Sequence, residues 1–181
     1  MELVVAMVEK SETRNPKSGI AIIALGSNLG DSRHIILDAM TRLQHFSDQP
    51  ILKSSLWQTS PVDCPPGSPK FVNAVVGLVP RKDETPESLL EKLQALEEEF
   101  GRSRGGILNE PRPLDLDLIA FGAETRISAD LILPHPRAPV RRFVLQPLSE
   151  IAPDLVLPKQ GKAVAELLAD LRDEGAVTRL D

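Results

Sequence analysis

Hydrophobic and polar residues follow one another along this chain in blocks that predict strands and helices in a definite order. Three short apolar runs are typical of strands: 20–25, 51–57 and 71–79. Apolar residues at helical spacing predict one helix from about Ser32 to Phe46. A second helix is predicted to begin at Thr85 and to end at Gly101, because threonine favours the start of a helix and glycine its end.

A fourth apolar run ends at Gly122 and predicts another strand. Side chains two residues apart share one face of a strand, so Asp115 and Asp117 would lie side by side. The opposite face would carry three leucines, at 114, 116 and 118. After this strand we expect a small hairpin-like element at 125–127 and a loop around 135. Two helices would follow, one at 143–148 and one at 164–171, and the second would close the chain.

The order strand, helix, strand, strand, helix, strand predicts an α+β fold. It is the order of the ferredoxin-like split βαβ sandwich, an antiparallel sheet with helices on one face. The other face would be left for loops and ligands. We expect residues 19–181 to form a single domain, and residues 1–18 to be a flexible N-terminal extension outside the fold.

Composition excludes several classes of protein. The chain has 181 residues, 41% of them hydrophobic and 26% charged, as in ordinary globular proteins. Its net charge of −5 argues against a nucleic-acid binder that relies on overall charge. No apolar run approaches the roughly 20 residues that a membrane helix needs. The single cysteine, Cys64, cannot form an internal disulfide, which fits a reducing compartment. We therefore expect a cytoplasmic monomer with no membrane or nucleic-acid partner.

The aspartate pair suggests a metal site. A buried strand has no inexpensive way to hold two adjacent like charges, and a metal ion would resolve the conflict. Two hard cations about 4 Å apart, bridged by carboxylates, are used in many phosphoryl transfers. The alternation of leucines and aspartates along this strand is explained equally well by a half-buried strand whose aspartates face water or pair with Lys or Arg. Residues on both sides of the pair favour the metal interpretation. Arg102, Arg104 and Arg112 precede it in the sequence, and His135 follows it.

Several segments together carry a family resemblance. They are Ala24-Leu25-Gly26-Ser27-Asn28-Leu29-Gly30, Thr59-Ser60-Pro61, Phe71-Val72-Asn73-Ala74, Gly101-Arg102-Ser103-Arg104, Pro111-Arg112-Pro113-Leu114-Asp115-Leu116-Asp117, Pro134-His135-Pro136 and Phe143-Val144-Leu145-Gln146-Pro147-Leu148. On these segments, between residues 20 and 158, the chain resembles the 6-hydroxymethyl-7,8-dihydropterin pyrophosphokinases. These folate-pathway enzymes move the β,γ-diphosphate of ATP onto a pterin alcohol.

The resemblance implies a role for each matching residue at the nucleotide. Asp115 and Asp117 would hold two Mg²⁺ ions that bridge the phosphates of the co-substrate ATP, in keeping with the preference of Mg²⁺ for carboxylate and phosphate oxygens. Arg102, Arg104 and Arg112 would surround the triphosphate and stabilise charge as the β-phosphorus is attacked. Further residues would line or support the nucleotide site: Gln94, Glu97, Leu118, His135 and Arg141.

The resemblance also implies a pterin site. A flat heteroaromatic ring favours stacking and hydrogen bonds at its edge. Phe71 and Phe143 match the stacking positions and Asn73 the amide that reads the ring edge, although core packing is the commoner use of any single Phe. Contacts from the proline-rich loop would come from Thr59, Ser60 and Val62.

The chain departs from the family pattern in the loop before the aspartates. Leu108, Asn109 and Glu110 stand where the family usually has a basic residue, an aromatic and a glycine, and Asp130 and Pro136 also differ. The alternative function is therefore a slow or non-catalytic homologue that binds pterin or nucleotide and has an altered lid loop. Two further alternatives stay open: another metal-dependent enzyme that acts on a nucleotide, and a scaffold with a vestigial site.

Overall fold

The computed structural model describes residues 19–61, 64–102, 110–172 and 177–180. The predicted N-terminal extension, residues 1–18, lies outside the described residues. None of the described helices combines the length and the apolar character that crossing a membrane requires.

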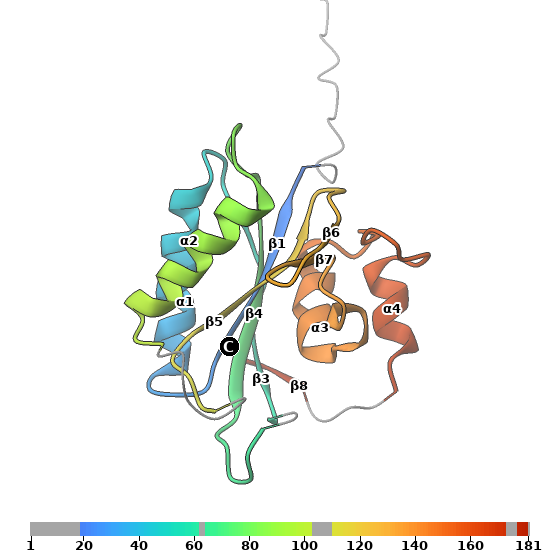
Figure 1. The fold of residues 1–181 in the computed structure, drawn as a ribbon. Coiled ribbons are helices and arrows are strands. Elements are labelled where there is room, and N and C mark those ends of the chain that lie inside the picture. The colour runs from blue at the N-terminus through green and yellow to red at the C-terminus, as the bar shows by residue number, and fades with distance from the viewer. Residues whose placement is uncertain (1–18, 62–63, 103–109, 173–176, 181) are drawn as a thin grey trace, which may run out of the picture.

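The centre of the molecule is an antiparallel sheet with strand order β5-β1-β4-β3-β8 (Figure 1). These strands are β1 (Ala21–Ser27), β3 (Leu56–Thr59), β4 (Phe71–Leu78), β5 (Asp115–Phe121) and β8 (Val177–Leu180). A short strand, β2 (Leu52–Lys53), also pairs with β4, and β6 (Arg126–Ile127) with β7 (Ile132–Leu133) forms the small hairpin that was predicted. The helical elements are α1 (Ser32–Leu43), α2 (Pro86–Glu99), α3 (Arg142–Ile151) and α4 (Val164–Asp170), with 3₁₀ turns η1 (Gln44–Phe46) and η2 (Ala138–Val140).

The two long helices begin where the sequence predicts. The Asp31 carboxylate accepts a hydrogen bond of 3.1 Å from the His34 N–H at the start of α1. At the start of α2, Thr85 and Ser88 exchange hydrogen bonds in a capping box, which satisfies two N–H groups that otherwise have no partner in the helix. Gly101 ends α2 with a positive φ of 88°, a backbone conformation that glycine adopts at little cost.

Helices α1 and α2 cover one face of the sheet (Figure 1). Their apolar stripes pack in one large buried cluster against Ile23 and Leu25 of β1 and against Leu116 and Leu118 of β5, with Leu114 just before that strand. This layer confirms the predicted α+β fold with an antiparallel sheet.

The opposite face is also partly covered by helices, contrary to the expectation that it would be left for loops and ligands. Helix α3 lies on that face beside α4 (Figure 1). Val144 and Leu148 of α3 are buried in a second cluster with Ile22 and Ile119 of the sheet. The strongly apolar side of α3 has to be buried, and the free sheet face is the surface available to it.

The chain does not close with the predicted helix at 164–171. Strand β8 follows it and pairs with β3 at the edge of the sheet. The residues of β8 are exposed or half-buried, so the strand lacks a clear apolar pattern. The strand predicted at 51–57 is interrupted at Ser54, whose hydroxyl accepts the Val75 N–H at 2.9 Å.

Candidate active site

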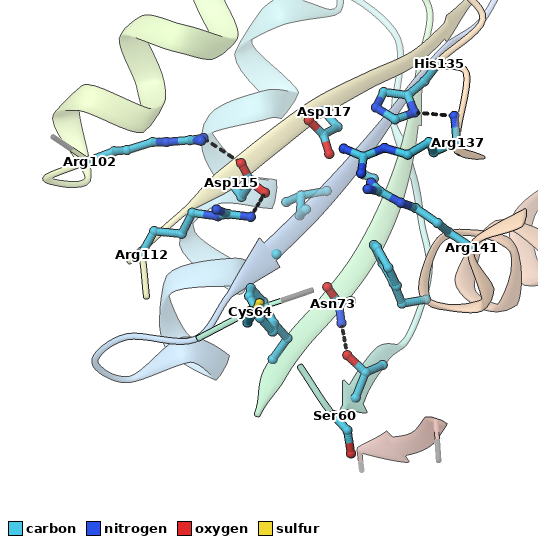
Figure 2. Close-up of a pocket in the computed structure, with 16 residues that line it drawn as sticks. Ser60, Cys64, Asn73, Arg102, Arg112, Asp115, Asp117, His135, Arg137 and Arg141 are labelled. Carbon is cyan, nitrogen blue, oxygen red and sulfur yellow. Dashed lines mark hydrogen bonds and ion pairs between the residues drawn. The ribbon is translucent and has the colours of Figure 1, made fainter. Parts of the chain in front are cut away.

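A pocket opens on the sheet face that α3 only partly covers (Figure 2). Its walls come from β1, β4 and β5, from the loop after β3, and from the segment that leads into α3. It brings together these predicted site residues: Arg102, Arg112, Asp115, Asp117, His135, Arg141, Thr59, Ser60, Phe71, Asn73 and Phe143. Positions more than 80 residues apart in the sequence thus line one cavity.

The aspartate pair projects from β5 into this pocket. Asp115 lies opposite Gly26 of β1 in the strand register, and Asp117 lies opposite Ala24. Both aspartates therefore share the pocket face, as the strand spacing predicts. The intervening Leu116 points to the other face and is buried in the large cluster.

Asp115 is held between two arginines. Its Oδ1 accepts from Arg102 Nη1 at 2.6 Å, and its Oδ2 lies 2.8 Å from Arg112 Nη2 (Figure 2). Burial alone would lower the pKa of Arg102, but Asp115 and then Glu97 outweigh it, so the net effect is a raised pKa. Arg102 is therefore a permanent cation at this edge of the pocket.

Glu97 supports this arrangement from behind. It is only 2% exposed, and its Oε1 accepts from Arg102 and, at 2.7 Å, from the Leu116 N–H. One buried carboxylate thereby fixes both an arginine and the strand that carries the aspartates. Glu97 itself does not line the pocket.

Asp117 has a different environment. Burial, and then the neighbouring Asp115 charge, raise its pKa to about 6, against the opposing effects of Arg141, Arg112 and Arg102. A cation at the pair would favour the ionised form of both carboxylates.

The ligand set fits Mg²⁺. Among the described residues, no group of three or more His, Cys, Asp or Glu side chains could hold a metal. Two carboxylates in a pocket leave coordination positions for water and phosphate oxygens, which is the arrangement that Mg²⁺ usually adopts with nucleotides. The Arg112 Nε is buried without a partner among the described residues, so this wall also has a donor to offer an anion.

His135 and two arginines lie on the other side of Asp117 (Figure 2). The His135 Nδ1 accepts a hydrogen bond of 3.2 Å from the Arg137 N–H. Burial, then Arg141 and Arg137, lower its pKa from the usual value. His135 is therefore neutral near pH 7, and the proton must lie on Nε2, which makes that nitrogen a hydrogen-bond donor.

A polar group from the sheet stands at the other end of the pocket. Asn73 is 5% exposed, and its Nδ2 donates to Thr59 Oγ1 at 2.7 Å. Its Oδ1 accepts no hydrogen bond from the described residues. A Cβ on Gly26 would lie 3.2 Å from this Oδ1 and 3.7 Å from the Phe71 ring, so glycine keeps this part of the pocket open.

The aromatic residues of the pocket each lie near an arginine. The Arg112 guanidinium is 5.9 Å from the centre of the Phe71 ring, and the Arg141 guanidinium is 5.3 Å from that of Phe143. Both rings are half-buried in the pocket lining. Each ring can therefore contact a flat ligand and still support a cation.

Some predicted residues do not reach the pocket lining. Gln94 is half-buried on α2, and the Leu118 side chain is buried in the large apolar cluster. Their predicted contacts with nucleotide, and that of Glu97, stay predictions. Two predicted residues, Val62 and Arg104, lie outside the described residues, as do Leu108 and Asn109 of the altered loop.

Three residues at or beside the pocket were not predicted as site residues from the sequence: Asn28, Cys64 and Arg137. The Asn28 Oδ1 accepts the Arg112 N–H at 2.9 Å, and the backbone N–H of Asn28 donates to the Arg112 carbonyl at 3.2 Å. Arg137 and Cys64 line the pocket. A signal for Arg137 was available, because it follows His135 by two residues and precedes Arg141 by four.

The chain is similar in sequence to known proteins of one family. Residues 22–153 match the model of the family described as 7,8-dihydro-6-hydroxymethylpterin-pyrophosphokinase. A Pseudomonas aeruginosa protein named 2-amino-4-hydroxy-6-hydroxymethyldihydropteridine pyrophosphokinase is 41% identical over 154 residues, covering 84% of this chain and 92% of the relative. A Synechocystis protein of the same name is 39% identical over 150 residues, covering 82% and 74%.

Other similar proteins are longer. An Arabidopsis thaliana protein named folate synthesis bifunctional protein is 37% identical over 130 residues, which cover 72% of this chain but 26% of the relative. The structure is similar to an HPPK-DHPS crystallised in complex with substrates, with a TM-score of 0.64 and 12% identity, over 84% of this chain and 43% of the other. That similarity establishes the fold.

Proposed function

Because the chain belongs to the 7,8-dihydro-6-hydroxymethylpterin-pyrophosphokinase family, we propose that it transfers the β,γ-diphosphate of ATP to 6-hydroxymethyl-7,8-dihydropterin in folate biosynthesis. The products are AMP and the pterin diphosphate. The observation that carries the proposal is that Asp115 and Asp117 face a single pocket together with Arg102 and Arg112.

Asp115 and Asp117 would hold two Mg²⁺ ions. When bound, Mg²⁺ neutralises charge on the triphosphate and polarises its phosphoryl oxygens. The elevated pKa of Asp117, to which burial and the Asp115 charge contribute, supports this assignment, because a bound cation offsets both.

Arg102 and Arg112 bind the phosphates and stabilise charge in the transition state. Their planar guanidinium groups offer several donors each and suit phosphate oxygens. Glu97 behind Arg102 and Asn28 beside Arg112 hold these arginines in position. Catalysis of phosphoryl transfer depends mainly on such positioning and charge.

The pterin occupies the end of the pocket at Asn73. The Asn73 Oδ1 would accept a hydrogen bond from the edge of the ring, and Phe71 and Phe143 would contact its faces. Thr59 holds the amide in one orientation, and Ser60 adds a hydroxyl at the rim.

In the reaction, the hydroxymethyl oxygen attacks the β-phosphorus and forms a new P–O bond. The bond from the β-phosphorus to the oxygen that bridges it to the α-phosphate breaks, AMP leaves with that oxygen, and the hydroxyl proton passes to solvent. His135 contributes a hydrogen bond from Nε2–H to a phosphate oxygen, because its Nδ1 lone pair is already used.

We further propose that residues 19–181 act as a single domain, as a monomer in the cytoplasm, on small molecules and without a nucleic-acid or membrane partner.

The first test is AMP formation from ATP and Mg²⁺, with and without 6-hydroxymethyl-7,8-dihydropterin. We expect pterin-dependent AMP from the wild type and none from Asp115→Ala. Asp38→Ala is the matched control, because Asp38 is exposed on α1. Pyrophosphate release would instead indicate another nucleotide-dependent enzyme, and pterin binding without AMP would indicate a binding protein.

A further inference from the structure

The backbone of Arg137 is held in place at the edge of the pocket. Its N–H donates to His135 Nδ1, and its carbonyl accepts from the Val140 N–H at 3.3 Å. The next residue, Ala138, is fully buried in the second apolar cluster. The Cα of Arg137 is thus held by the core although its side chain is exposed.

The Arg137 side chain lines the same pocket as the aspartate pair. Figure 2 draws it with Arg141 and His135 near Asp117, whereas Arg102 and Arg112 are bonded to Asp115. The lowered pKa of His135, after burial and Arg141, has the Arg137 charge as its next cause, which agrees with this closeness.

Within the described part of the chain, the Arg137 guanidinium has no hydrogen-bond or ion-pair partner. This distinguishes it from Arg102 and Arg112, which are engaged with Asp115. It also differs from surface arginines such as Arg126, which is paired with Glu87. A guanidinium with all its donors available, at the edge of a pocket, can bind an incoming anion without first breaking an ion pair.

We propose that Arg137 binds a phosphate oxygen of ATP and so acts as a nucleotide-binding residue on the Asp117 side of the site. This inference rests on the proposed function. The described pocket lining carries four arginines against two aspartates, with Arg102 and Arg112 at Asp115 and with Arg137 and Arg141 near Asp117 (Figure 2). A triphosphate bound at the pair would then be held from two directions.

The test is equilibrium binding of a non-hydrolysable ATP analogue with Mg²⁺ to the wild type, Arg137→Ala and Arg137→Lys. Arg33→Ala is the control, because Arg33 is exposed on α1 and outside the pocket lining. We expect Arg137→Ala to bind the analogue about tenfold more weakly, as for the loss of a charged hydrogen bond. Arg137→Lys should be intermediate and Arg33→Ala unchanged.

Three further readouts separate phosphate binding from a structural effect. The salt dependence of analogue binding should become shallower in Arg137→Ala, because one fewer phosphate charge is neutralised. Added guanidinium ion at millimolar concentration should restore part of the affinity. Adenosine, which lacks phosphates, should bind to wild type and variant equally. Equal analogue affinity, or an equal loss for adenosine, would overturn the proposal.

Failure of the Arg137 role and failure of the proposed reaction give different results. Analogue binding is measured without pterin, so an Arg137-dependent affinity in a wild type that forms no AMP would contradict the reaction and support the residue's role. Pterin-dependent AMP formation with the same KM for ATP in Arg137→Ala would support the reaction and contradict the role.

Discussion

The two faces of β5 differ in chemistry although alternating residues of one short strand form them. Toward α1 and α2 the strand presents Leu116 and Leu118, both buried in the large apolar cluster. Toward the pocket it presents Asp115 and Asp117, of which Asp115 is balanced by two arginines and Asp117 has an elevated pKa. The apolar face supplies stability, and the polar face holds charges that the fold alone does not need.

Among substitutions on the two faces of β5 and beside them, Asp117→Asn is expected to have the largest effect on activity. The amide keeps the shape of the carboxylate but is a much weaker ligand for a cation, so AMP formation should fall roughly a thousandfold. Steady-state kinetics with Asp38→Asn as the matched control would measure this. Activity within a few-fold of the wild type would exclude Asp117 as a metal ligand.

The same variant should be more stable than the wild type without ligands. The pKa of Asp117 in the folded protein, about 6, exceeds the ordinary value of 3.8. Between these values the folded state binds more protons than the unfolded state, so the wild type loses stability as pH rises through this window. The variant should gain up to about 3 kcal/mol above that window and nothing below it. The measurement is denaturant unfolding of wild type and variant at several pH values, with a chelator present. A difference in the free energy of unfolding that does not change with pH would contradict a cost of the Asp117 charge.

Leu116→Ala tests the opposite face of the same strand. Truncating this buried leucine should cost roughly 2–4 kcal/mol in the free energy of unfolding. Activity per folded molecule should change little, because Leu116 does not line the pocket. Leu37→Ala, at a leucine that is 46% exposed on α1, is the control for the substitution itself. A large loss of activity with normal stability would contradict the division between the faces.

Glu97→Gln addresses the point where the two faces are linked. Glutamine can still accept the Leu116 N–H through its carbonyl oxygen, but it removes the charge that holds Arg102. We expect kcat to fall about tenfold, because one charged hydrogen bond that positions Arg102 is weakened. The neighbouring Glu98 is exposed, so Glu98→Gln is a close control. An unchanged kcat would indicate that Arg102 is positioned without Glu97.

The smallest effect is expected from Asn73→Ala, at the pterin end of the polar face. Loss of the amide should raise the KM for the pterin about fivefold to tenfold and leave that for ATP unchanged, since a ligand hydrogen bond is lost. Gln58→Ala changes a neighbouring β3 residue that lies outside the pocket lining. A matching rise in the KM for ATP would point to a general distortion of the pocket.

The sequence predicted the elements whose patterns are local. The alternation around Asp115 defined a strand with two different faces, and Thr85 and Gly101 defined the ends of α2, because capping and side-chain period depend only on neighbouring residues. The family resemblance assigned the activity, and the pocket unites most of the residues that it named. Strand β8 was missed because its pairing with β3 depends on a distant strand and not on its own pattern.

The sequence by itself therefore determined the order of the strands and helices before β8, the shared face of the aspartates and the residue types needed for diphosphate transfer. Only the tertiary structure decided that α3 covers part of the second sheet face, that Glu97 stands behind Arg102, and that Arg137 reaches the pocket with no partner among the described residues. The physical reason is that side-chain period and capping are local properties of the chain. Burial, ion pairing and pKa depend on which distant residues the folded chain brings together.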